Sequence, residues 1–259
     1  RQRKMGITYV GLDIYSDKTI NDIIENKLCD GVILGDLFCE NRMFQYGNND
    51  LIKYFEEISK TDLDIIYQTP YYLTSRNDRQ IYNNLRYLYN LKSESVILVS
   101  DVGFAAKIKQ EFPEFKVAWS HMHRGRVDDK NDFTYSFLKQ LGVDYVETAD
   151  VCKVEAIEAN KLGVWMVFGK IKYKTFGRKC YLQDQLGETL PNCRKLCINS
   201  LYTLREKESN YSMTVDGYIL GKTLDYTNNT FGTNDTVCIY AYSYKDLVKR
   251  MGEIKHEEI

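Results

Sequence analysis

The sequence predicts an α/β protein in which eight parallel strands close into a TIM-like (β/α)8 barrel. Up to about residue 168, short apolar stretches alternate with amphipathic stretches of helical period, a pattern typical of strand–helix–strand units with right-handed crossovers. A similar pair near the carboxyl end supplies an eighth unit. With 259 residues and 44% hydrophobic content, the chain is long enough for one barrel-sized core. We therefore expect a single barrel domain over residues 1–259.

The individual elements follow from the periodicity of the apolar residues. The first seven strands are expected over residues 7–12, 31–34, 64–67, 95–99, 116–119, 144–146 and 164–168. The helices between them are expected over residues 18–26, 50–59, 78–89, 104–110, 133–140 and 153–160. Beyond them, residues 201–205 and 211–220 are predicted to be extended, 236–242 to form the eighth strand and 243–251 its helix. An open doubly wound sheet is the alternative, but no G-x-G-x-x-G follows the first strand.

Charge and motif content exclude several classes of protein. The net charge of -1 gives no general attraction to nucleic acid or to an anionic membrane, and no apolar run approaches the length of a spanning helix. The basic start RQRKMGITYV continues directly into an alternating stretch without the apolar core of a secretory signal, so we expect a reducing, cytoplasmic compartment. The sequence contains no H-E-x-x-H, no G-x-S-x-G and no Walker loop.

A cluster of cysteines follows the seventh predicted strand. The segment FGRKCYLQDQLGETLPNCRKLC contains Cys180, Cys193 and Cys197, three of the seven cysteines. In a reducing compartment, thiols at such spacings predict a metal or iron–sulfur site. Because such a site normally needs four protein ligands, a fourth is expected from elsewhere, and Cys39 in GVILGDLFCENR is the best candidate. Residues 170–200 are therefore predicted to be a cysteine-rich, cluster-binding insertion.

The remaining polar and thiol candidates have simpler alternatives. Cys29, Cys152 and Cys238 lie in apolar patterns and are predicted to be buried packing residues. Polar residues gather where the predicted strands end, and in a barrel these ends converge on one face. They are Asp36, Cys39, Arg42, Gln68, Thr69, Asp101, His121, His123 and Glu147. Each of them is alternatively a cap or a satisfied surface group. His121 is the best functional candidate because imidazole moves protons near neutral pH.

Four motifs together carry a family resemblance. They are GVILGDLFCENR, the SDVG turn after the fourth strand, SHMHRG at the fifth, and GRKC followed after twelve residues by CRKLC. Together they resemble peptidase family U-32, the collagenase-like family, and within it the UbiV-type branch, which serves oxygen-independent ubiquinone hydroxylation with a UbiU-type partner. The resemblance covers roughly residues 7–198 and weakens beyond them.

The resemblance implies a cofactor, a partner and a reaction class. In that branch four cysteines hold a [4Fe-4S] cluster, and these positions correspond here to Cys39, Cys180, Cys193 and Cys197. A second family U-32 protein as heterodimer partner, a small-molecule substrate and prephenate as a possible oxygen donor are also implied.

Three further residues fall on matching positions and are carried over as catalytic or pocket candidates, namely Arg42, Asp101 and His121. In this role the Arg42 guanidinium would hold a substrate carboxylate, and His121 would move protons.

The leading interpretation is an iron–sulfur component of an oxygen-independent hydroxylase that acts on a small molecule. The composition rich in Tyr, Lys and Asn departs from that of quinone-pathway proteins, so the substrate is expected to differ from a quinone precursor. The tail over residues 214–231 also departs from the family pattern, which bears on the last barrel strand and on any partner-binding surface. Three alternatives stay open. They are a non-catalytic subunit of a heterodimer, a zinc-bound U-32 peptidase and an enzyme that hydroxylates RNA. Four thiolates would make zinc a closed structural site, and the net charge offers RNA binding little help.

Overall fold

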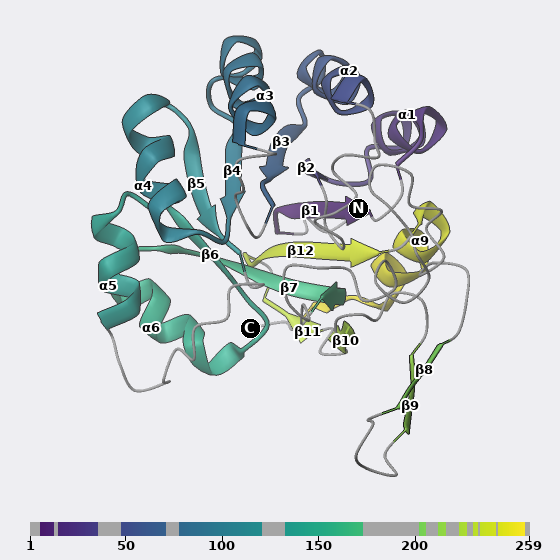
Figure 1. Ribbon diagram of the computed structural model, residues 1–259. Coiled ribbons are helices and arrows are strands. Elements are labelled where there is room, and N and C mark those ends of the chain that lie inside the picture. Colours follow the sequence, from purple (N-terminus) through teal and green to yellow (C-terminus); the bar gives the residue numbers. More distant parts are fainter. Residues whose placement is uncertain are drawn as a thin grey trace.

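Eight parallel strands close into a barrel in this computed structural model (Figure 1). It describes residues 6–12, 15–35, 48–70, 78–120, 133–172, 202–205, 212–215, 223–226, 230–232, 234–241 and 243–256. The barrel strands are β1 (Thr8–Leu12), β2 (Gly31–Gly35), β3 (Asp64–Gln68), β4 (Val96–Val99), β5 (Lys116–Trp119), β6 (Tyr145–Thr148), β7 (Gly163–Lys172) and β12 (Thr236–Ala241). Closure comes from β7, which pairs in parallel with both β6 and β12, and from β12, which pairs with β1. The predicted barrel, including its eighth strand, is confirmed.

Helices follow the strands around the outside of the barrel, as Figure 1 shows. They are α1 (Asp17–Asn26), α2 (Asn48–Ser59), α3 (Asp78–Leu91), α4 (Val102–Glu111), α5 (Phe133–Gln140), α6 (Val154–Ala159) and α9 (Tyr244–Glu253), with a 3-10 turn η2 (Val151–Lys153) before α6. All seven predicted helices are confirmed. The alternating units of strand and helix predicted from periodicity therefore place every strand carboxyl end on one face of the barrel.

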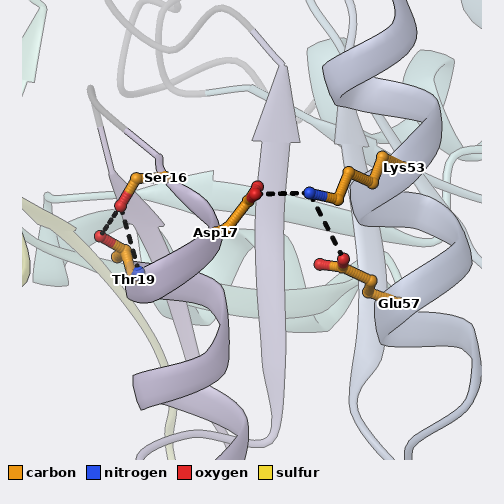
Figure 2. Close-up of polar contacts among 5 residues, drawn as sticks. All are labelled: Ser16, Asp17, Thr19, Lys53 and Glu57. Carbon is orange, nitrogen blue, oxygen red and sulfur yellow. Dashed lines mark hydrogen bonds and ion pairs between the residues drawn. The ribbon is translucent and has the colours of Figure 1, made fainter.

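The amino end of α1 illustrates how local sequence fixes a helix boundary (Figure 2). The Ser16 side chain accepts a hydrogen bond from the Thr19 backbone N–H at 3.2 Å, which satisfies one of the free donors of the first turn. Asp17 pairs with Lys53 of α2 at 2.5 Å, and Lys53 also lies 3.8 Å from Glu57. Because the Asp17 and Lys53 side chains are exposed, this network contributes little to stability.

Additional short strands lie outside the closed eight-stranded barrel. β10 (Thr223–Tyr226) pairs antiparallel with the last four residues of β7, from Gly169 to Lys172. β8 (Tyr202–Arg205) and β9 (Ser212–Val215) form a separate antiparallel pair, and β11 (Thr230–Phe231) pairs with β13 (Lys255–His256). The sequence predicted β8 and β9 as extended segments, but it missed β10 and ended β7 four residues early. The seventh strand thus extends beyond its barrel neighbours.

Apolar side chains divide into an outer and an inner core. The outer core lies between the strands and the helices and includes Phe55, Tyr67 and Phe115, all fully buried. The inner core fills the barrel with side chains from alternate strand positions. It consists of Tyr9, Ile33, Ile66, Val96, Leu98, Ala118, Trp165, Val167, Cys238 and Tyr240. Period-two alternation therefore assigns each strand residue to one core or the other.

Within the stretches that the structure describes, no helix combines the length and the apolar character needed to cross a bilayer.

Candidate functional site

Polar side chains point into the barrel near the carboxyl ends of its strands. Gln68 ends β3 and pairs in register with Leu98, a member of the inner core, so its side chain lies on the inward face. By the same argument Glu147 of β6 faces inward, because its register partner is Trp165. Ser100 and Ser120 directly follow β4 and β5, two positions beyond inward residues. We call Gln68, Ser100, Ser120, Glu147 and Tyr240 the inner polar group, and all five are at most 5% exposed.

Glu147 and Tyr240 are joined across the barrel interior. The Tyr240 hydroxyl donates a hydrogen bond to the Glu147 carboxylate, which connects β12 to β6 past the intervening β7. The Cys238 thiol, two residues earlier on β12, is hydrogen-bonded to the same carboxylate. A buried carboxylate is costly unless donors surround it, and two donors from one strand meet that need here.

These contacts hold both donors in their protonated forms. Burial raises the pKa of Tyr240 well above its usual range, and the negative charge of Glu147 raises it further. Burial and then the same charge raise the pKa of the Cys238 thiol. Cys238 is therefore a hydrogen-bond donor to Glu147 and a poor nucleophile.

The side chain of Gln68 has no hydrogen-bond partner among the described residues. It is 1% exposed, and among the described residues neither its amide nitrogen nor its amide oxygen has a hydrogen-bond partner. Its backbone is fixed firmly, because Thr69 continues the ladder by donating its N–H to the Leu98 carbonyl at 3.0 Å. An unpaired buried amide is rare in folded proteins, so this side chain calls for a functional explanation.

Of the predicted site residues, only Asp101 lies in the described part of the chain. Its side chain accepts a hydrogen bond from the Phe104 N–H at 2.8 Å and caps α4, and the residue is exposed. This is the cap role that the sequence left open for every polar residue at a strand end. The other predicted site residues, Arg42, His121, Cys39, Cys180, Cys193 and Cys197, lie outside the described residues. Their predicted roles stay predictions.

The structure corrects one of the three cysteines predicted to be packing residues. Cys29 and Cys238 are buried as expected, but Cys152 is exposed. The reason is local: Asp150 accepts a hydrogen bond from the Cys152 N–H at 3.0 Å and holds it in the turn η2, which precedes the buried face of α6. The apolar neighbours of Cys152 suggested a buried helix that begins two residues later in the structure.

This difference predicts how the thiols react. A small alkylating reagent should modify Cys152 in the native protein and leave Cys29 and Cys238 unmodified, because burial raises the pKa of Cys29 to about 12 and shields both thiols. Mass spectrometry of tryptic peptides before and after denaturation checks this. Native labelling of Cys238 as fast as Cys152 would contradict the packing of β12.

Tyr240 is the functional candidate that sequence reasoning missed. It lies in the strand TVCIYA, and alternation there places Cys238 and Tyr240 on one face. The signal was therefore present in the sequence, but the face that points inward could be assigned only once β12 was known to lie between β7 and β1.

Within the described ranges, no three His, Cys, Asp or Glu side chains come together as a metal site.

The fold and the inner polar group define a parallel (β/α)8 barrel with buried polar side chains near the carboxyl ends of its strands, where barrel enzymes place their active sites. No protein-family model matches the chain, and a search of curated proteins finds no match.

Solved structures with a similar fold are distant in sequence. A chain of the tryptophan synthase a2b2 complex of Pyrococcus furiosus is 15% identical, with a TM-score of 0.47 over 64% of this chain and 78% of that chain. Muconate lactonizing enzyme from Pseudomonas putida is 10% identical, with a TM-score of 0.45 over 64% of this chain and 47% of that chain. Deoxyribose phosphate aldolase from Aeropyrum pernix is 10% identical, with a TM-score of 0.42 over 63% and 76%. The assignment of the fold rests on the closed strand order itself.

Proposed function

We propose that the protein is an iron–sulfur component of an oxygen-independent hydroxylation system that acts on a small molecule, as its resemblance to peptidase family U-32 implies. The observation that supports this proposal most directly is where the thiol-bearing segments start. Cys39 follows β2, and Cys180, Cys193 and Cys197 follow β7. In a closed parallel barrel both strands end on the same face, which is also the face nearest the inner polar group.

Chain length limits how far these thiols lie from the barrel. Cys39 is four residues beyond Gly35, so its Cα lies within about 14 Å of the end of β2. Cys180 is eight residues beyond Lys172, which gives a limit of about 29 Å from the end of β7. Four thiolates drawn from these two segments suit a [4Fe-4S] cluster, which supplies one electron at a time when bound.

The other proposed residues start from the same face. His121 directly follows Ser120, whose N–H donates to the Val99 carbonyl at 2.8 Å and so continues the β4–β5 ladder. In the proposal His121 moves a proton at the substrate, and Arg42 holds a substrate carboxylate by paired hydrogen bonds. Asp101 acts indirectly: by capping α4 it fixes the chain that leaves β4. A second family U-32 chain is the proposed partner, and the cytoplasm the proposed compartment.

Anaerobic purification with iron, sulfide and zinc analysis and a visible spectrum tests the proposal. The parent protein should be brown, with about four iron and four sulfide per chain, and the Cys193→Ala variant should lose both. Cys152→Ala is the matched control, since it removes an exposed thiol outside the proposed ligand set and should keep the full iron content.

Two outcomes would contradict the proposal. A colourless parent that holds zinc or no metal would leave a structural zinc site or a metal-free subunit. Equal loss of iron in Cys193→Ala and Cys152→Ala would show that the thiols act without selectivity, as in adventitious metal binding.

A further inference from the structure

Glycines and polar residues gather in the upper barrel interior, next to the carboxyl ends of the strands, whereas the deeper interior carries mostly large apolar residues. Inward positions deeper in the barrel carry large residues such as Tyr9, Ile66 and Trp165, and the Tyr9 and Trp165 rings lie edge to face with centroids 4.9 Å apart. Register partners on neighbouring parallel strands face the same side of a sheet. The upper inward positions found in this way combine small residues with larger polar ones. The small residues are Gly11, Gly35, Ser100, Ser120 and Gly169, and the larger ones are Gln68, Glu147 and Tyr240. Large apolar residues therefore occupy most of the deeper inward positions, and glycines and polar residues gather near the carboxyl ends of the strands.

Two of these glycines are required by the backbone. Gly35 and Gly169 have φ values of +125° and +96°, and an added Cβ would lie 2.2 Å from the carbonyl oxygens of Gln68 and Tyr240 respectively. A larger residue at either position would clash with the neighbouring strand. Glycine is thus required beside the backbones of Gln68 and Tyr240 by the strand geometry.

Gln68 presents its amide to this space without a partner. Both of its polar side-chain atoms are unpaired among the described residues, although the residue is only 1% exposed. A terminal amide pairs best with a ligand edge that offers one donor and one acceptor side by side, as glutamine does with the N6/N7 edge of adenine. The unpaired amide therefore specifies the hydrogen-bonding pattern of its missing partner.

Glu147 and Tyr240 restrict the charge of that partner. The Glu147 carboxylate lies in the same interior, buried and hydrogen-bonded to Tyr240 and Cys238. A second negative charge in a low-dielectric interior is repelled by the first, whereas a neutral group that offers N–H or O–H donors is favoured. Prephenate, the anionic oxygen donor that the family resemblance implies, does not suit this interior.

From these observations we propose that the upper barrel interior is a binding site for a small uncharged molecule with a carboxamide-like donor–acceptor edge, which pairs with the Gln68 amide. Primary amides, ureides, lactams and pyrimidine-like rings have this chemistry. Glu147 and Tyr240 accept hydrogen bonds from the donors of the same molecule. The site is built entirely from described barrel residues and needs neither the cluster nor a partner chain.

Acetamide and acetate test the proposal, because the two molecules have nearly the same shape and differ in charge and donor content. The acetamide methyl resonance should broaden and shift saturably when protein is added, at millimolar concentration as expected for so small a ligand, and acetate should show no saturable effect. The side-chain NH₂ pair of Gln68, identified by its loss in Gln68→Met, should move with acetamide.

The variant supplies the second arm of the test. Gln68→Met keeps the length of the side chain and removes both unpaired atoms, so it should fold with an unfolding midpoint equal to or above the parent's and lose the acetamide response. Two results would overturn the proposal: no saturable acetamide effect on the parent, as when ordered water already satisfies the amide, or an undiminished effect on Gln68→Met. Repeating the parent titration on Cys193→Ala separates this site from the cluster, since acetamide binding should persist there.

Discussion

We expect the Gly35→Ala variant to lose about 3 kcal/mol of unfolding free energy, one of the two largest effects foreseen for this protein. Gly35 ends β2 with φ at +125°, a conformation that L side chains rarely adopt. The new Cβ would lie 2.2 Å from the backbone oxygen of Gln68, an atom that cannot rotate away. Strain and clash therefore add, and the end of the β2–β3 ladder has to shift. Chemical denaturation followed by circular dichroism measures the loss.

Gly252→Ala is the control for this substitution. Gly252 lies in α9, and nothing lies within 4 Å of an added Cβ. In a helix alanine is favoured over glycine, so this variant should equal the parent or exceed it by up to about 0.5 kcal/mol. If Gly35→Ala and Gly252→Ala had the same free energy of unfolding, β2 could not lie as close to β3 as the structure places it.

The second large effect is expected at Tyr240→Phe, which should lower the free energy of unfolding by about 2 kcal/mol. The substitution keeps the ring in the inner core and removes the hydroxyl that donates to Glu147. A buried carboxylate then loses one of its donors, and the cost of desolvation is no longer offset. Denaturant unfolding at neutral pH provides the measurement.

A matched surface pair isolates the effect of burial. Tyr87 donates its hydroxyl to Glu56 in the same kind of contact, but Tyr87 is 38% exposed. Tyr87→Phe should therefore change stability by no more than about 0.5 kcal/mol, because water replaces the lost contact. If Tyr240→Phe and Tyr87→Phe lowered the free energy of unfolding equally, the buried Glu147 carboxylate would not need the hydrogen bond from Tyr240.

The pH dependence of the Tyr240→Phe difference has a definite sign. The folded-state pKa of Tyr240 is raised well above the usual tyrosine value, so its contribution is present below about pH 10 and is lost as the pH rises beyond that. The stability difference between parent and variant should accordingly be constant near neutral pH and narrow in alkaline solution. A difference that widened with rising pH would contradict the direction of this shift.

Apolar periodicity was sufficient to predict most of the barrel before any coordinates. For β5 and α5 the predicted and observed bounds coincide, because a short apolar run and a strong helical period leave little freedom. β10 was missed because it pairs with an extension of β7 beyond Gly169, where a positive φ lets the strand continue past its barrel neighbours. The extension of β7 pairs with β10, which lies more than 50 residues later in the chain, so a short stretch of sequence does not reveal the pairing.

The candidate site was only partly predictable for a similar reason. Gln68 and Glu147 could be predicted as candidates because they are polar residues at the ends of predicted strands. Tyr240 looked like an ordinary strand aromatic, and its role appears only when β12 and β6 are brought to either side of β7. The prediction that Cys152 is buried was wrong. Its apolar neighbours suggested burial, but the hydrogen bond from the Cys152 N–H to Asp150 holds the residue in an exposed turn. Face and partner are properties of the closed sheet, and sequence reveals them only indirectly.

Gly35 and Gly169, two of the three described glycines with positive φ, bear on how sequence variation in this fold is interpreted. Gly35 and Gly169 should stay invariant among relatives for backbone reasons alone, whatever those relatives bind. The backbone does not require glutamine at position 68, because an apolar residue of similar length would fill the position without burying unpaired polar atoms. Retention of glutamine there across diverging sequences would thus reflect selection for a ligand, whereas retention of the glycines would reflect only the architecture.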